Sequence, residues 1–170
     1  MCIRDSIRGD QSFVKEESQG EIDFMNPYEM QRRMVKACAL ADKAEELGFL
    51  PDELANEHPK ARESLAKMCG VKPPSLETWE MVVDLLDKRV SYEGEGGLDD
   101  PRFIQHLGSM AVEITETLIK HNVDSDEAAN LSKSEKRRVA KMSKASDDER
   151  TFDLGQKFLE MREEHRLKNT

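Results

Sequence analysis

The sequence predicts an all-α protein: a small helical bundle with a helix-turn-helix-like corner and polar C-terminal helices that project or pack on a partner. Apolar residues recur at intervals of three and four through the middle of the chain, between Pro and Gly breaks. Aromatic residues make up only 5% of the 170 residues, which disfavours an all-β sandwich. Because the chain is 36% charged, we expect a modest core to which the nine Met and many Ala contribute.

The first predicted helix covers about residues 27–47. Asn26 suits the N-cap, Pro27 the first helical position, and Glu29 the third position of a capping box. Its apolar stripe includes Met30 and Met34 and is assigned to the core. Gly48 then supplies a left-handed C-terminal cap.

Two further helices are expected over about 60–69 and 75–90, after one or two helical turns within 51–56. The later helix carries an apolar stripe that would form its buried face. The members of that stripe are Leu76, Trp79, Val83, Leu86 and Val90. Residues 25–90 are therefore predicted to form one helical subdomain.

The remaining chain is predicted to add a linker and more helices. Residues 91–99 are rich in Gly and lack the Lys and hydroxyl residue of a phosphate loop, so they indicate a flexible linker. The segment 100–122 is the strongest amphipathic helix and is expected to pack on the body. Residues 123–170 should hold polar helices at about 132–144 and 147–167. Capping boxes are expected at Ser132 with Glu135 and at Ser146 with Glu149, and no internal repeat is evident.

The segment 61–80 has the pattern of two short helices that meet at a steep angle. Ala66 is a small residue where the helices would cross, and Gly70 tolerates the positive φ that the turn requires. The positions expected to face inward are Leu65, Cys69, Val71, Leu76 and Trp79. The positions expected to face outward are Lys72, Pro73, Pro74, Ser75, Glu77 and Thr78.

The run Leu65-Ala66-x-x-x-Gly70-Val71, followed by Leu76-x-x-Trp79-Glu80, resembles the helix-turn-helix of the phage-repressor-like DNA-binding superfamily. The resemblance implies a second helix laid in the major groove. The residues it would place against bases or phosphates are Lys72, Ser75, Glu77 and Thr78. This sequence departs from the pattern because the second helix stays apolar through Val90 and its reading face has no Arg. The alternative interpretation is a purely structural helix corner.

A second candidate nucleic-acid site is the basic run over 133–144, in which Glu135 is the only acidic residue. Phosphate contacts there would make binding salt-dependent. The candidate residues are Lys133, Lys136, Arg137, Arg138 and Lys141. The alternative is a solvated helix face.

Charge and cysteine content restrict the function further. Lys and Arg total 26 against 35 Asp and Glu, so the formal net charge of −9 disfavours a whole surface devoted to nucleic acid but allows a local basic patch. No apolar run approaches the roughly 18 residues of a membrane helix, so we expect a cytoplasmic protein with no membrane partner. The three Cys fit neither a disulfide framework nor a zinc site.

Catalytic and metal-binding patterns are not evident. The His residues show no metal-ligand spacing, and His106 and His121 are expected to be paired or to cap a helix. No Gly-x-Ser-x-Gly elbow occurs. Cys38 and Cys69 are expected to be small core residues. We therefore expect no catalytic residue, no metal and no cofactor.

The N-terminal residues 1–24 lack the helical patterns of the following chain. Residues 1–6 resemble the conceptual translation of a transposase adapter used in sequencing libraries, which would indicate a metagenomic gene prediction; the alternative is a genuine polar N-terminus. Residues 1–24 show no periodicity and are expected to be disordered.

Two functional hypotheses follow. The first is a non-enzymatic DNA-binding accessory or regulatory protein, of phage type like a small terminase subunit, or a transcriptional regulator. The second is a helical interaction or scaffold protein that binds other chains through the 101–121 stripe or the C-terminal helices, by helix-in-groove association. The expected partners are thus duplex DNA, another helical protein, or a second copy of the chain in a homo-oligomer.

Overall fold

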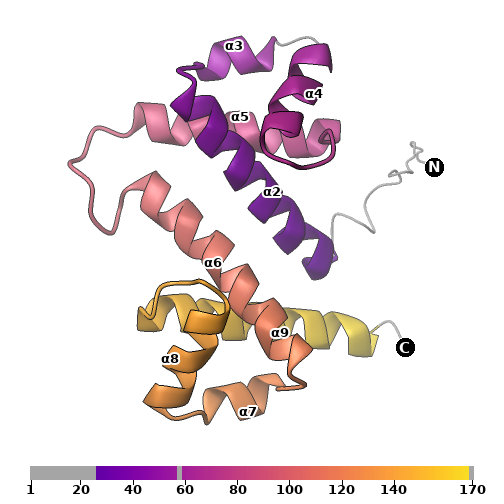
Figure 1. The fold of residues 1–170 in the computed structure, drawn as a ribbon, viewed down its shortest axis with the longest axis vertical. Coiled ribbons are helices and arrows are strands. Elements are labelled where there is room, and N and C mark those ends of the chain that lie inside the picture. The colour runs from indigo at the N-terminus through magenta and orange to yellow at the C-terminus, as the bar shows by residue number, and fades with distance from the viewer. Residues whose placement is uncertain (1–25, 57–58, 169–170) are drawn as a thin grey trace.

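A computed structural model describes residues 26–56 and 59–168, which contain eight α-helices and no strand (Figure 1). The all-α prediction is confirmed. The predicted disordered segment 1–24, including the adapter-like residues 1–6, lies outside the described residues.

The first four helices lie where local signals predicted them. They are α2 (Pro27–Glu46), α3 (Pro51–Ala55), α4 (Pro59–Met68) and α5 (Leu76–Ser91). The side chain of Asn26 accepts the Tyr28 amide at 2.9 Å, so the predicted N-cap of α2 is formed.

The last four helices are α6 (Pro101–Lys120), α7 (Ser125–Ala129), α8 (Lys133–Met142) and α9 (Glu149–Lys168). The predicted capping box of α8 is confirmed, because the Ser132 amide donates to Glu135 at 2.9 Å and Ser132 Oγ accepts the Glu135 amide at 3.2 Å. The box predicted for Ser146 is wrong. Ser146 Oγ instead accepts the amide of Asp148 at 3.1 Å, and α9 starts directly after Asp148.

The second four helices repeat the first four in order, and the first three pairs also match in length. α2 and α6 each have 20 residues, α3 and α7 five, and α4 and α8 ten. The residues that open these pairs stand 74 positions apart: Pro27 and Pro101, Pro51 and Ser125, Pro59 and Lys133. The expectation that no internal repeat exists is therefore wrong. In Figure 1 the first repeat occupies one end of the long axis and the second repeat the other.

The backbone turns repeat as well. Gly48 and Asn122 end the first helix of each repeat with φ of 81° and 59°. Gly70 and Lys144 follow the third helix with φ of 70° and 56°. Because Asn and Lys replace Gly in the second repeat, the sequence signal for the left-handed turns is lost there.

Each repeat has its own core. In the first, Leu40, Trp79 and Leu86 are buried together, and Trp79 Nε1 donates to the Leu54 carbonyl at 2.9 Å. Phe152 takes the place of Trp79 in the second core, 73 positions later because the last turn is one residue shorter. Each core is small, which accords with the composition.

The C-terminal helices do not project from the body. α9 packs along α6 and touches α2, while α7 packs on α9 and α8 on α6. The helix at 101–120 opens the second repeat and packs on α2 and α5 of the first as well as on α9. Its apolar stripe, with Ala111, Ile114 and Leu118, is buried inside the protein and is not a free docking surface. Residues 92–100 link the two repeats.

Candidate functional site

The start of α5 is largely exposed, as the helix-turn-helix resemblance requires. Lys72, Ser75 and Glu77 face solvent. Thr78 does not: it is only 5% exposed, and its Oγ1 lies 3.1 Å from Ser75 Oγ inside the first turn. Leu76 was expected to face inward but is 60% exposed.

These differences have one cause: the buried face of α5 is rotated relative to the predicted stripe. The residues of α5 that are buried are Thr78, Trp79, Val82, Leu86 and Arg89. α5 packs on both α2 and α3. The positions of these two helices determine which apolar face of α5 is buried. Val90 is accordingly half exposed, contrary to the prediction.

The charges around the start of α5 are mixed. Burial and the neighbouring charge of Lys72 lower the pKa of Lys36, so two cations lie close together there. Glu77 and Glu80 are exposed carboxylates on the same helix. The exposed tip therefore carries cations and carboxylates side by side.

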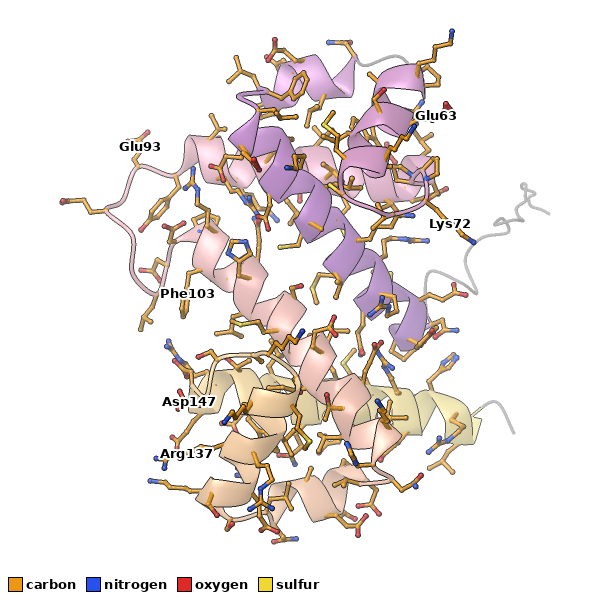
Figure 2. All side chains as sticks on the ribbon, in the orientation of Figure 1. Glu63, Lys72, Glu93, Phe103, Arg137 and Asp147 are labelled. Carbon is orange, nitrogen blue, oxygen red and sulfur yellow. The ribbon has the colours of Figure 1, made fainter. Side chains whose placement is uncertain are left out.

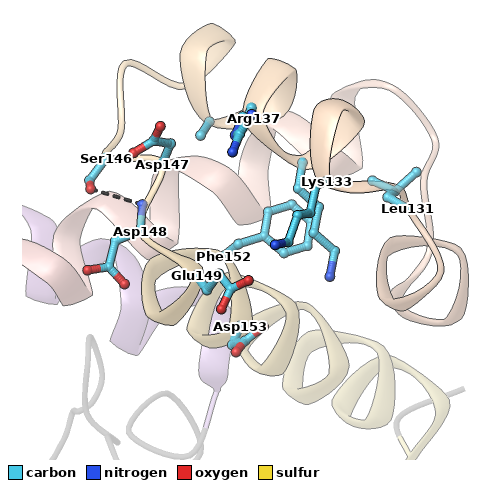
Figure 3. Close-up of a pocket in the computed structure, with 11 residues that line it drawn as sticks. Leu131, Lys133, Arg137, Ser146, Asp147, Asp148, Glu149, Phe152 and Asp153 are labelled. Carbon is cyan, nitrogen blue, oxygen red and sulfur yellow. Dashed lines mark hydrogen bonds between the residues drawn. The ribbon is translucent and has the colours of Figure 1, made fainter.

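The helix corner occurs twice in the chain. The Val71 amide donates to the Ala66 carbonyl at 3.0 Å, and the Ala145 amide donates to the Ala140 carbonyl at 2.9 Å. The tip of the second corner is acidic, with Asp147, Asp148 and Glu149 (Figure 3). The same corner geometry therefore supports tips of different charge in the two repeats.

The predicted basic run forms α8 and faces that acidic tip. Lys133, Lys136 and Arg137 line one wall of a pocket of about 340 Å³. Lys136 Nζ stands 5.2 Å from the centre of the Phe152 ring. The opposite wall carries carboxylates, shown in Figure 3: Asp147, Asp148, Glu149 and Asp153. A polyanion that approached this face of α8 would meet those carboxylates.

The other basic residues of α8, Arg138 and Lys141, are exposed and do not line the pocket. Figure 2 places Lys72 and Arg137 on opposite sides of the protein. The corner and the basic run therefore do not form one continuous surface.

A polar cluster lies where the two repeats meet. Cys38, Asp42 and His106 offer ligand atoms within 4.8 Å of one another. The fully buried guanidinium of Arg89 lies against them, with Nη1 at 2.9 Å from Asp42 Oδ1. A cation would be repelled by this guanidinium, and burial raises the pKa of Cys38 to about 11, which keeps the thiol protonated. The cluster is a polar network centred on Arg89, in which His106 Nε2 lies 2.8 Å from Asp42 Oδ1 and is thus paired, as was expected of this histidine without a named partner.

Cys38 is buried as predicted, and Cys69 is half-buried with Sγ at 3.7 Å from the Ala39 carbonyl. Burial raises the pKa of Cys69 as well. Arg89 Nη2 lies 3.8 Å from Cys38 Sγ, but burial outweighs this cation and leaves the pKa of the thiol raised, so neither cysteine is activated as a thiolate.

Two buried glutamines join the repeats reciprocally. Gln31 of α2 donates to the Phe158 carbonyl of α9, and Gln105 of α6 donates to the Leu85 carbonyl of α5, both at 3.2 Å. Reciprocal contacts of this kind are those of a two-fold interface, so the repeats are related by a pseudo-two-fold axis.

Two apolar hollows flank this axis and form what we name the inter-repeat groove. One, of about 690 Å³, includes Met30, Met34, Met81, Leu85, Phe158 and Met161. The other, of about 580 Å³, includes Met34, Leu85, Tyr92, Pro101 and Ile104. The two hollows share Met34 and Leu85 among their lining residues, and together they are lined by α2, α5, α6 and α9.

Two large apolar side chains of the groove reach solvent. Ile104 and Met161, which line it, are 54% and 48% exposed. The residues at its floor, Gln31 and Gln105, already have hydrogen-bond partners. The arrangement can therefore cover an apolar surface, and it offers few polar groups to a small polar ligand.

Sequence reasoning missed the groove because Met30 and Met34 were assigned to the core. Both are half-buried. The sequence did contain a signal for the groove, because the apolar surface of the first helix is wide enough to serve both a core and a groove. Met30 and Met34 face the groove, whereas Leu40 and Ala44 belong to the core of the first repeat.

Within residues 26–56 and 59–168 no helix combines the length and apolar character needed to cross a membrane. No protein-family model, curated protein or solved structure matches the chain. The fold and the groove thus define a class, a helical protein of two repeats around a pseudo-two-fold axis.

Proposed function

We propose that this is a non-enzymatic interaction protein that holds a helical segment of another protein in the inter-repeat groove. The observation that carries the proposal is the pair of adjoining apolar hollows that share Met34 and Leu85, with Ile104 and Met161 half exposed among their lining residues. An exposed apolar surface of this kind marks an interaction site more often than a neutral feature of the surface.

The residues that line the groove favour a helical partner. Four methionines line the trough, and their flexible side chains adapt to apolar side chains of different shapes: Met30, Met34, Met81 and Met161. An amphipathic helix presents apolar side chains at i, i+3, i+4 and i+7, which is the usual way to fill a groove between helices.

The proposal is tested with a synthetic amphipathic peptide that has an apolar stripe and a neutral Gln/Ser polar face. The full chain should bind the peptide, with shifts of the methionine methyl NMR signals, and Met34→Glu should abolish binding. The matched control is Met68→Glu, because Met68 is a half-exposed methionine on α4 outside the groove. Equal binding by both variants, each shown by circular dichroism to be folded, would refute the proposal.

A second candidate function, DNA contact at the start of α5, has support from a separate observation. Ser75 and Glu77 are exposed there, and Lys72 lies close to Lys36. A helix start with nearby cations can approach a phosphate backbone.

This candidate is tested by a mobility shift with random duplex DNA at low and moderate salt. Binding should weaken in Lys36→Ala/Lys72→Ala with a shallower salt slope, and Lys136→Ala/Arg137→Ala/Arg138→Ala tests α8 in the same way. The absence of a shift at micromolar protein in low salt would exclude DNA contact.

A further inference from the structure

The charges in the inter-repeat groove lie at its two ends. Lys88 lines the hollow that contains Ile104, and Lys168 lines the hollow that contains Met161. Met34 and Leu85, which both hollows share, lie between them. The groove is thus an apolar trough with a lysine toward each end.

These lysines contrast with the protein as a whole. The chain has a net charge of −9, yet the charged residues that line the groove are two lysines, Lys88 and Lys168, and one carboxylate, Glu164. Lys88 pairs with Asp84 at 3.1 Å on the same helix, and both side chains are about 60% exposed. Such an exposed pair is weak, so a carboxylate of a bound partner can replace Asp84.

The position of Lys88 is not imposed by the repeat. Its equivalent in α9 is Met161, which keeps the second hollow apolar at that point. Lys168 lies in the last turn of α9, beyond the part of that helix that matches α5. Lys88 and Lys168 therefore occupy positions that the repeat does not relate to each other, although each lies toward one end of the groove.

On these grounds we propose that the partner is an amphipathic helix with carboxylates at both ends of its apolar stripe. The inference rests on the proposed function and names the chemistry of the partner. The apolar stripe would cover Leu85 and the four methionines, and Glu or Asp residues at its two ends would pair with Lys88 and Lys168.

The test compares three peptides that share one apolar stripe and carry Glu, Gln or Lys at both ends. The full chain should bind the Glu peptide roughly three- to tenfold more tightly than the Gln peptide, and the Lys peptide least. The difference should shrink as the salt concentration rises. Lys88→Glu/Lys168→Glu should reverse the order, whereas Lys67→Glu/Lys120→Glu, at exposed positions outside the groove, should preserve it.

The outcomes separate this inference from the proposed function. If the Gln peptide binds and the order is flat or reversed, the acidic partner is wrong and the helix-binding groove stands. If no peptide binds, both fail. If light scattering shows a dimer that Met34→Glu converts to a monomer, a second copy of this chain occupies the groove, and the acidic partner is overturned.

Discussion

Arg89 and Arg162 stand 73 positions apart, and each donates from Nε at 2.7 Å to a buried glutamine of the other repeat. Arg89 holds Gln105 and Arg162 holds Gln31. Each glutamine in turn donates to a carbonyl on the helix that supplies its arginine. The junction between the repeats thus has the reciprocal contacts of a symmetric dimer, formed within one chain.

Arg89→Ala should destabilise the protein by about 3 kcal/mol, measured by urea unfolding. The fully buried guanidinium pairs with Asp42 and Glu45, and its loss removes one partner from each carboxylate and the donor to the side-chain oxygen of Gln105. Arg89→Met should cost less because it keeps the buried stem. The control is Lys67→Ala at an exposed position, which should change the free energy of unfolding by no more than about 0.5 kcal/mol. If Arg89→Ala had an effect as small as that of the control, the stabilising role of the network would be contradicted.

Gly155→Ala should destabilise the protein by about 1–3 kcal/mol. An added Cβ would lie 2.8 Å from Ile114 Cγ2 and 3.0 Å from the Ala111 carbonyl oxygen, which is fixed backbone where α9 meets α6. Thermal unfolding measures the effect. Unchanged stability would mean that α9 does not pack so closely on α6.

Gly108→Ala, in α6, should affect stability differently from Gly155→Ala in α9. A Cβ added at Gly108 would meet the Met34 sulfur at 3.3 Å, and this flexible side chain can move. Alanine gains up to about 1 kcal/mol of helix propensity, so stability should stay equal or rise. Because Met34 must move, peptide binding in the groove should weaken. Unchanged binding in this variant would count against Met34 as a contact residue.

Lys144→Gly and Gly70→Lys should change stability in opposite directions. Both positions have positive φ, of 56° and 70°, and lysine is strained there. We expect a gain of up to about 1 kcal/mol for Lys144→Gly and a loss of about 1 kcal/mol for Gly70→Lys. Each corresponds to a shift of about 2–4 °C in Tm by calorimetry. Shifts of the same sign would show that φ does not govern these turns.

Acid should destabilise the protein partly through Glu45. Its pKa is lowered from the ordinary 4.5, first by the hydrogen bonds from Arg102, which donates from Nε at 2.7 Å. A lowered pKa in the folded state contributes stability that is complete above 4.5 and is lost as pH falls through the folded value. In urea unfolding against pH, Glu45→Gln should lower stability at neutral pH and flatten the slope below 4.5. Arg102→Met should do the same, and a wild-type slope in that variant would assign the shift to another partner.

The limits of the helices could be predicted because the signals for them are local. Asn26 with Pro27 and Asp100 with Pro101 each cap a helix within a few residues, and their side chains accept the amides that the helix start leaves free. No distant residue is needed for that interaction. The repeat was not predicted because its two halves have similar helices but different residues at equivalent positions. Examples are Trp79 with Phe152 and Gly70 with Lys144.

The sequence by itself therefore determined an all-α chain and the start and end of most of its helices. Only the tertiary structure decided that α5 buries Thr78 and Arg89 while exposing Leu76, and that Met30 and Met34 line a groove. The physical reason is that a helix with apolar residues on more than one face can cover any of them. The neighbouring helices, which come from distant parts of the chain, select the face that is buried.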